Sequence, residues 1–313
     1  MTTTITTTDL AAPVRTGPAP GSGPRVARRT PEGWVDQPYR RFALTPATPI
    51  IGAEISGIDL ADIDDELFAE LHRALLEWKV LFFRDQHLTE HEHEALGRRW
   101  GELESHPFFH ASNPQLEDRP AVVRLAKDDT TPGYENLWHS DVTWREHPSL
   151  GSLLRAVELP AVGGDTLWAD MGAAYDGLPD EMRQRIDGLV ATHDWIDTFG
   201  RAMDPAERDA LRPNFPPVEH PVVRTHPETG RKTLYVNAAF TQHIVGMDPV
   251  ESHDLLDRLY RQASHPEYQC RFRWSEGALA IWDNRSTQHY AASDYFPQRR
   301  VMERITVIGD RPY

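Results

Sequence analysis

Residues 282–309 read WDNRSTQHYAASDYFPQRRVMERITVIG, and this stretch decides how the rest of the chain is interpreted. It places His289 eleven positions before Arg300, which heads an apolar run. If that run is a strand, its alternation turns Arg300 and Arg304 to the same face. Two arginines on an inward face are costly unless they meet anions. The stretch therefore predicts a strand that carries cationic side chains into an anion-binding site.

The other half of this site is expected far upstream, at His139 and Asp141. Residues two apart in a strand point to one face, so both side chains can aim at one point. A His-x-Asp triplet alone is weak evidence in a chain with 15 histidines. With His289 supplied by another strand, the set becomes two imidazoles and one carboxylate. Such a set holds ferrous iron and leaves about three octahedral positions open, whereas a structural zinc site closes all its positions.

The second residue type that carries chemistry here is arginine. The guanidinium of Arg300 is a rigid fork that suits a carboxylate. 2-Oxoglutarate presents such a carboxylate at its distal end once its keto-acid end chelates iron. A surface ion pair would be the alternative role, but it does not explain the face that Arg300 shares with Arg304. The residues therefore predict Fe(II) as cofactor, with 2-oxoglutarate and O2 as cosubstrates.

The composition limits partners and location. With 48 acidic and 33 basic side chains, the formal charge is −15, so nucleic acid is not an expected partner. The single cysteine, Cys270, excludes an internal disulfide and any cysteine-built zinc or iron–sulfur site, which fits a cytoplasmic protein. Apolar runs are only a few residues long and the N-terminus lacks the plan of a secretion signal, so no membrane partner is expected.

The chain divides into a tail and one domain. Residues 1–40 are rich in Thr, Pro, Gly and Arg, a composition that buries too little apolar surface to offset the entropy of ordering. We expect a disordered or loosely ordered tail there. All-β barrels and sandwiches often use a length like the remaining 41–313 for a single domain.

Helices and strands alternate at the start of this domain. Leucines four apart predict a helix over residues 65–78, and the run KVLFFR at 79–84 predicts a buried strand. Thr89-x-x-Glu92 is a capping box that opens a helix through Trp100.

The rest of the chain is rich in strands. Helical patterns intervene only at residues 180–189 and 250–263. Short strands with Gly and Pro between them suggest a jelly-roll barrel with helices against one sheet. The expected strands are 152–158, 166–169, 222–226, 233–236, 268–274, 278–282 and 301–308.

Three stretches together resemble one enzyme family, the taurine/2-oxoglutarate dioxygenase (TauD/TfdA) group of non-haem iron enzymes. They are His139-x-Asp141, the run GGDTLW at 163–168, and the pattern WDNRxxxH at 282–289 that continues through Arg300 and Arg304. The combination is specific, and the resemblance covers roughly residues 42–312.

The resemblance implies a mainly β fold with flanking helices, built on a double-stranded β-helix, a jelly-roll barrel of the cupin type. It also implies a metal site formed by His139, Asp141 and His289. Thr166 and Arg300 would hold the 2-oxoglutarate carboxylate, a role for Thr166 that comes from the resemblance alone. Relatives are commonly dimers or tetramers, so a homo-oligomer is expected.

The same resemblance points to a substrate pocket. It implies that Arg304 and His106 grip an anionic head group, and the full set of expected substrate-binding residues is His106, Phe109, Glu135, Val142, Phe199, Phe240 and Arg304. Two of these depart from the taurine-cleaving pattern, because Phe109 stands in place of a tyrosine and Glu135 in place of an asparagine. Buried polar partners discriminate strongly between substrates, so these changes matter. Glu135 either pairs with a substrate ammonium or faces solvent. Ordinary core packing would suit Phe199 and Phe240 equally well.

The implied reaction is hydroxylation of a small anionic substrate. Taurine or a related alkyl sulfonate, cleaved to sulfite and an aldehyde, is the leading expectation. The alternatives are an alkyl sulfate, or a carboxylate or amino-acid-like metabolite. A zinc hydrolase built on the same ligands would leave Arg300 and Thr166 without a role, and a non-catalytic anion-binding barrel is the remaining alternative. A second histidine tract at 87–93 is not expected to bind metal, because His91 and His93 face different directions on a helix.

Overall fold

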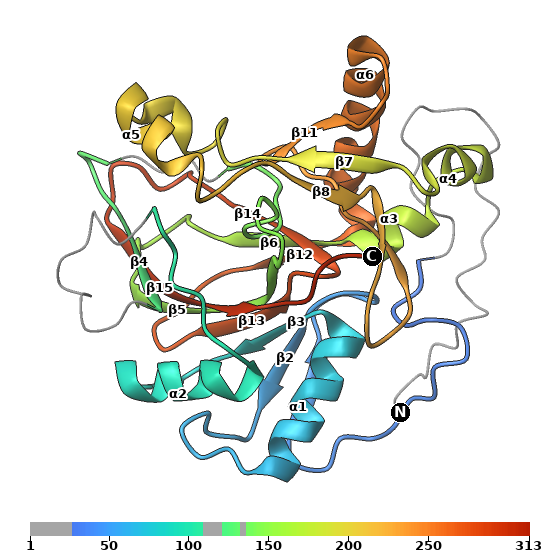
Figure 1. Cartoon of the computed structure of the whole chain (residues 1–313). Helices are drawn as coiled ribbons and strands as arrows, with labels where there is room; N and C mark the ends of the chain where they lie inside the picture. Colours follow the sequence, from blue (N-terminus) through green and yellow to red (C-terminus); the bar gives the residue numbers. More distant parts are fainter. Residues whose placement is uncertain (1–26, 109–120, 132–135) are drawn as a thin grey trace.

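The structure is a computed structural model that describes residues 27–108, 121–131 and 136–313. It is mainly β with helices at the periphery, as the sequence predicts (Figure 1). Within these residues, no helix is both long and apolar enough to span a membrane.

The largest element is a seven-stranded sheet. Its neighbouring strands are antiparallel except β2 and β3, which are parallel. The strand order is β1 (Ala43–Pro46), β2 (Ala53–Ser56), β3 (Val80–Phe83), β13 (Leu279–Asp283), β5 (Ser149–Glu158), β15 (Arg300–Ile308) and β4 (Val122–Lys127).

A smaller sheet lies against this one, with the strand order β12 (Gln269–Phe272), β6 (Thr166–Asp170) and β14 (Thr287–Ala291) (Figure 1). Aromatic rings join the two sheets: Phe82 stacks on Phe272 with centroids 4.3 Å apart and meets Trp168 edge-on at 5.4 Å. The chain passes from β5 to β6, and later from β12 through β13 and β14 to β15, changing sheet at each step. Residues far apart in sequence are therefore brought close together.

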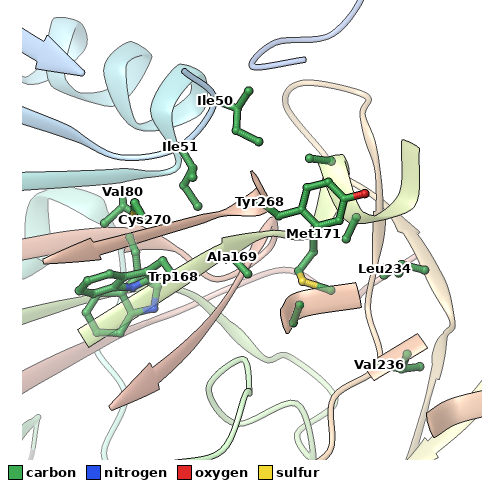
Figure 2. Close-up of a cluster of buried hydrophobic side chains, with 14 of the residues drawn as sticks. Ile50, Ile51, Val80, Trp168, Ala169, Met171, Leu234, Val236, Tyr268 and Cys270 are labelled. Carbon is green, nitrogen blue, oxygen red and sulfur yellow. The ribbon is translucent and has the colours of Figure 1, made fainter. Parts of the chain in front are cut away.

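Apolar side chains fill the space around the small sheet, as Figure 2 shows. The labelled members of this cluster are Ile50, Ile51, Val80, Trp168, Ala169, Met171, Leu234, Val236, Tyr268 and Cys270. The single cysteine is thus part of the core, and burial raises the pKa of its thiol to about 12, which leaves it unreactive.

Helices α1 (Asp65–Trp78) and α2 (Glu90–Trp100) cover the outer face of the large sheet (Figure 1). Strand β3 is apolar on both faces for this reason: Val80 and Phe82 belong to the core between the sheets, and Leu81 and Phe83 pack with the helices. The predicted capping box opens α2, because the side chains of Thr89 and Glu92 each bond to the other's backbone N–H.

The remaining elements are shorter sheets and peripheral helices. A three-stranded sheet has the order β11 (Thr241–Ile244), β7 (Val190–His193) and β8 (Val218–Pro221), and a separate pair consists of β9 (Val223–Thr225) and β10 (Lys232–Leu234). The helices are α3 (Met171–Asp176), α4 (Asp180–Ile186), η3 (Gly200–Ala202), α5 (Pro205–Leu211), α6 (Pro249–Tyr260), η4 (Arg261–Ser264) and η5 (Pro266–Tyr268).

The predicted strands are all present within a few residues of their expected bounds. The helix expected at 180–189 ends earlier, at Ile186, and the one expected at 250–263 ends at Tyr260 and continues only as a 3-10 turn. Strands β7, β8, β11 and β14 are not among the predicted strands, because they are short and rich in polar residues.

Residues 27–40 contain no helix or strand but are attached to α1. Arg29 pairs with Glu77 at 3.0 Å and with Asp36 at 2.6 Å, and the Tyr39 hydroxyl donates to Glu77 at 2.7 Å. The rest of the predicted tail, residues 1–26, lies outside the described residues.

Candidate active site

The structure brings together the three side chains that the sequence predicts as metal ligands. His139 and His289 form an isolated antiparallel bridge, in which the amide of each donates to the carbonyl of the other at 3.1 and 2.8 Å. The Oδ1 atom of Asp141 lies 3.9 Å from Nε2 of His139 and 3.8 Å from Nε2 of His289. One ligand atom from each residue lies within 4.8 Å of the others, so the three can share a single ion.

The protonation states suit a cation at this point. Nδ1 of His139 lies 2.8 Å from the Leu137 carbonyl, so this nitrogen carries the proton and the Nε2 lone pair faces the centre. Burial, with help from the neighbouring His139, lowers the pKa of His289 to about 3, so its imidazole is neutral at pH 7. Two imidazole nitrogens and one carboxylate oxygen fit a divalent ion such as Fe(II).

Asp141 is buried and held through both of its oxygens. Arg304 donates from Nη1 to Oδ1 at 2.6 Å, and Ser152 donates from its hydroxyl to Oδ2 at 2.8 Å. Burial alone would raise the pKa of this carboxyl. Arg304 and the two neighbouring histidines outweigh the effect of burial and hold the pKa well below its usual range. Asp141 is therefore anionic throughout the working pH range.

The backbone turns sharply directly after this ligand. Val142 has φ of 49°, a left-handed conformation that β-branched residues rarely adopt. It is held there by neighbouring hydrogen bonds: the amide of Arg145 donates to the Val142 carbonyl at 2.9 Å, and the Asn237 side chain donates to the Thr143 hydroxyl at 3.0 Å. Strain of this kind costs about 1–3 kcal/mol and is typical of functional sites.

A cavity of about 60 Å³ opens on one side of the triad. The residues expected to hold 2-oxoglutarate, Thr166 and Arg300, both line it together with His139 and His289. The Thr166 hydroxyl accepts a hydrogen bond from Nε1 of Trp274 at 3.0 Å, which leaves its own proton available for an anion. The cavity therefore brings a guanidinium and a hydroxyl donor into the same space as two of the metal ligands.

The GGDT motif is explained by Arg300. Gly164 has φ of 72°, and a Cβ atom placed on it would lie 2.9 Å from both Cδ and Nε of Arg300. Its amide donates to Asp294 at 2.8 Å. Glycine is required here because the Arg300 side chain crosses directly over this backbone on its way into the cavity.

A second cavity, of about 100 Å³, also borders the triad. His139 and Arg304 line both cavities, and Asp141 lines this second one. The walls are aromatic, since Phe199 lies 6.0 Å from Phe240 and 5.7 Å from His106 between ring centroids. Every expected substrate-binding residue that the structure describes lines this cavity, namely His106, Val142, Phe199, Phe240 and Arg304.

The other two expected substrate-binding residues, Phe109 and Glu135, lie outside the described residues. Among the lining residues that are described, Asp141 is the one carboxylate, and it is already paired with Arg304. The described part of this cavity therefore offers an anion-binding end and apolar walls, with no acidic partner for a substrate ammonium.

The residues of the WDNR pattern, at 282–285, have structural roles that the sequence did not predict. Asp283 is buried, accepts a hydrogen bond from Nε2 of His226 at 2.9 Å and forms an ion pair with Arg285 at 2.8 Å, which fixes the turn between β13 and β14. The side-chain oxygen of Asn284 accepts from Nε1 of Trp282 at 3.0 Å and from the amide of Asp141 at 3.4 Å. This stretch therefore positions both His289 and Asp141.

Two further residues around Asp141 were missed at the sequence level. Ser152, on β5, and Asn237, before β11, carry no motif, and only the pairing of distant strands brings them to the site. The histidine tract on α2 is arranged as expected, because His91 is exposed and His93 is fully buried.

Comparison with known proteins identifies relatives over most of the chain. The family model described as "Taurine catabolism dioxygenase TauD, TfdA family" matches residues 42–306. An alkylsulfatase of Acinetobacter baylyi is 38% identical over 286 residues, which cover 88% of each chain. An alpha-ketoglutarate-dependent sulfate ester dioxygenase of Pseudomonas putida is 37% identical over 276 residues, covering 85% of this chain and 89% of that one.

Solved structures agree with the sequence relatives. The crystal structure of a taurine dioxygenase from Burkholderia xenovorans superposes with a TM-score of 0.74 at 36% identity. The match covers 87% of this chain and 91% of that one.

Proposed function

The chain belongs to the TauD, TfdA family of dioxygenases, and from this premise we propose that it is an Fe(II)- and 2-oxoglutarate-dependent dioxygenase acting on a small organic sulfur oxyanion. The observation that carries the proposal is that two cavities border the triad. One cavity carries Arg300 and Thr166, and the other carries Arg304 and His106. A hydrolytic zinc site would have no use for the first cavity.

When bound, Fe(II) and 2-oxoglutarate supply the oxidant that hydroxylates a substrate C–H bond, with O2 consumed and CO2 and succinate released. The protein holds and orients the reactants. Arg300 and Thr166 bind the distal carboxylate of the cosubstrate, while Arg304 and His106 bind the anionic head of the substrate. The walls formed by Phe199, Phe240 and Val142 exclude water and direct the carbon next to the head group towards the metal ligands.

The position of hydroxylation determines the products. Hydroxylation of the carbon that bears a sulfate ester oxygen gives an intermediate that collapses to an aldehyde and sulfate. Hydroxylation of the carbon that bears a sulfonate gives an aldehyde and sulfite in the same way. In both cases the leaving group takes the electron pair of its bond to carbon and the hydroxyl loses its proton.

An alkyl sulfate or alkyl sulfonate with an apolar chain is the substrate class that the described cavity favours. Its walls are apolar, and two relatives are described as an alkylsulfatase and a sulfate ester dioxygenase. Taurine is the second candidate, supported by the solved taurine dioxygenase, and it requires an ammonium partner such as Glu135. A carboxylate substrate would use the same cationic end.

We extend the proposal to the architecture and assembly. Strands that change sheet at each step from β12 to β15 support a double-stranded β-helix of the jelly-roll, cupin-like type. We also propose a single catalytic domain at residues 41–313 following the tail at 1–40, a homo-oligomer (dimer or tetramer) and a cytoplasmic location. The one cysteine, which is buried, fits a reducing compartment.

The test is reconstitution without oxygen, using Fe(II) and 2-oxoglutarate, followed by exposure to O2. Parallel reactions contain medium-chain alkyl sulfates, alkyl sulfonates, taurine or no substrate, and succinate, sulfate and sulfite are measured in each. Sulfate release from alkyl sulfates, with succinate above the substrate-free background, is the expected result. Sulfite from taurine would instead support the second candidate, and product formation without iron or 2-oxoglutarate would contradict the proposal.

The metal centre is tested by Asp141→Ala. Removing the one carboxylate among the three described ligands should abolish iron-dependent succinate formation while leaving the far-ultraviolet circular dichroism spectrum unchanged. Asp187→Ala is the matched control, because Asp187 is exposed and pairs with the exposed Lys232 at 3.1 Å, so it should be dispensable. Activity in Asp141→Ala equal to the wild type would show that the ligand assignment is wrong.

A further inference from the structure

We infer that Ser152 is a positioning residue for the metal centre, whose hydroxyl holds one oxygen of Asp141 so that only the other oxygen faces the ion. The inference rests on the proposed function, because it assigns a role at the proposed metal site. It starts from a buried hydroxyl that no motif identifies and that touches a predicted ligand directly.

The hydroxyl is fixed in place by the large sheet. Ser152 is completely buried in β5, directly opposite Trp282 of β13 on one side and Thr306 of β15 on the other. A residue paired on both sides in the middle of a sheet has little freedom to move its backbone. Its Cβ direction, and therefore the reach of its short side chain, is set by the strand.

The two oxygens of Asp141 have different environments. Oδ1 lies 3.8 and 3.9 Å from the Nε2 atoms of the two histidines, so it is the oxygen on the metal side. Oδ2 points back to the Ser152 hydroxyl at 2.8 Å. Because an ionised carboxylate can only accept, the proton of this bond belongs to Ser152, and the serine oxygen is left to accept from the Thr306 hydroxyl at 3.4 Å.

This arrangement determines how Asp141 can bind an ion. A carboxylate tied through Oδ2 offers one oxygen, whereas a carboxylate free to rotate can offer both. A second oxygen on the ion would take one of the open positions that the cosubstrate and O2 require. Groups that orient metal ligands in this way typically affect metal affinity or activity by about 10–100-fold when mutated.

The test is a titration of the metal-free protein with Co(II) in competition with a chelator, together with the visible absorption spectrum of the Co(II) form. Ser152→Ala should bind Co(II) about 10–100-fold more weakly and show a changed spectrum, since the ligand geometry differs. Ser149→Ala removes a buried hydroxyl of the same strand, one that donates to the Gly151 carbonyl at 3.0 Å, so its affinity for Co(II) should stay close to that of the wild type. Thermal melting of each metal-free variant checks that the fold is retained.

The outcomes separate this inference from the proposed function. If Asp141→Ala loses Co(II) but Ser152→Ala binds it with wild-type affinity and spectrum, the role of Ser152 is wrong while the metal centre stands. If the wild type itself fails to bind Co(II), the proposed centre fails. Should Ser152→Ala not fold, Ser152→Cys keeps the shape with a weaker donor, and a wild-type spectrum in that variant would equally contradict the inference.

Discussion

At the scale of single residues, two arginines on β15 are expected to divide the binding work. Arg300 and Arg304 are both buried and both line the cavity assigned to 2-oxoglutarate. Arg304 also contacts Asp141 and lines the second cavity, whereas Arg300 lies against Tyr295 with its guanidinium 5.7 Å from the ring centroid. The side chain farther along the strand is therefore the one placed to meet the organic substrate.

The first prediction follows from this division. Arg300→Ala should raise the KM for 2-oxoglutarate by about 10–100-fold, as expected for the loss of charge-assisted hydrogen bonds worth about 1.5–3 kcal/mol. Arg304→Ala should raise the KM for the sulfur oxyanion far more than that for 2-oxoglutarate. Both constants are measured from succinate formation at saturating Fe(II).

Arg299→Ala is the matched control for these variants. Arg299 is next in sequence to Arg300, but its side chain is 48% exposed and pairs with Glu158 and Asp128 at the surface. Neither KM should change. Equal losses for both substrates in Arg304→Ala would mean that this arginine supports the metal ligand and does not select the substrate.

Residue chemistry explains what the sequence could and could not predict about the site. His139, Asp141, His289 and Arg300 were predictable because their chemistry is carried by residue type and spacing. The left-handed turn at Val142 was not, because its side chain argues against such a conformation and only tertiary contacts hold it. The role of Ser152 was not predictable either, because only the pairing of the strands brings its hydroxyl to Asp141.

At the scale of elements, β15 serves two functions on its two faces. Arg300 and Arg304 face the site, while Glu303 faces the other way and is 1% exposed. Glu303 lies directly opposite Arg124 of β4 and Arg155 of β5. It accepts from Arg124 at 2.6 Å and from Arg155 at 2.9 and 2.5 Å, so one carboxylate ties three strands together.

The second prediction is that Glu303→Gln destabilises the fold without changing substrate binding. Glutamine keeps the shape but removes the charge, leaving two largely buried guanidinium groups without an anion. Breaking a buried pair on one side costs roughly 3 kcal/mol. The unfolding free energy from urea denaturation should fall by about this amount, while both KM values stay unchanged.

The control is Glu158→Gln, which removes an exposed partner of Arg299. Exposed pairs contribute roughly 0–1 kcal/mol, so this variant should be close to the wild type. A similar loss in both variants would show that burial of the three-strand ion pair has no special effect.

Elements differ in how far their own sequence predicts them. Helix α1 and strand β3 were predictable because leucine spacing and an unbroken apolar run record the faces they bury. Strand β14, sequence TQHYA, has no such pattern, although it carries His289 itself. It is a strand because β6 pairs along its whole length, which is information held by another part of the chain.

At the scale of the whole molecule, four of the six buried histidines in the described residues link stability to pH. Burial lowers the pKa of His93 and His289 to about 3 and of His220 to about 4, and holds the pKa of His193 well below its ordinary value. Glu104 acts in the opposite direction, because burial raises the pKa of its carboxyl to about 7. The folded protein therefore keeps four imidazoles neutral at pH values where the unfolded chain protonates them.

The third prediction is a steep loss of stability in mild acid. A histidine whose folded-state pKa is lowered stabilises the fold above its unfolded pKa, about 6.5, and this contribution is lost as the pH falls. Glu104 partly offsets the loss, because in the folded state it already holds a proton that the unfolded chain releases above about pH 4.5. Near pH 5 the four histidines hold about four more protons in the unfolded chain and Glu104 about one fewer, so these five groups together bind about three more protons in the unfolded chain than in the folded one. The unfolding free energy of the metal-free protein should then fall by about 4 kcal/mol per pH unit, at 1.36 kcal/mol per proton.

Substitution of one histidine identifies the cause of that slope. His93 is fully buried in α2 and is not one of the proposed metal ligands. His93→Leu therefore removes one of the four histidines, and the slope of unfolding free energy against pH should fall by about 1.4 kcal/mol per pH unit near pH 5. His91→Leu, on the same helix but exposed, should leave the slope unchanged. The slopes come from urea denaturation at several pH values in the presence of a chelator. If His93→Leu retained the wild-type slope, acid unfolding would have to start from the buried carboxylates, whose protonation begins only at lower pH.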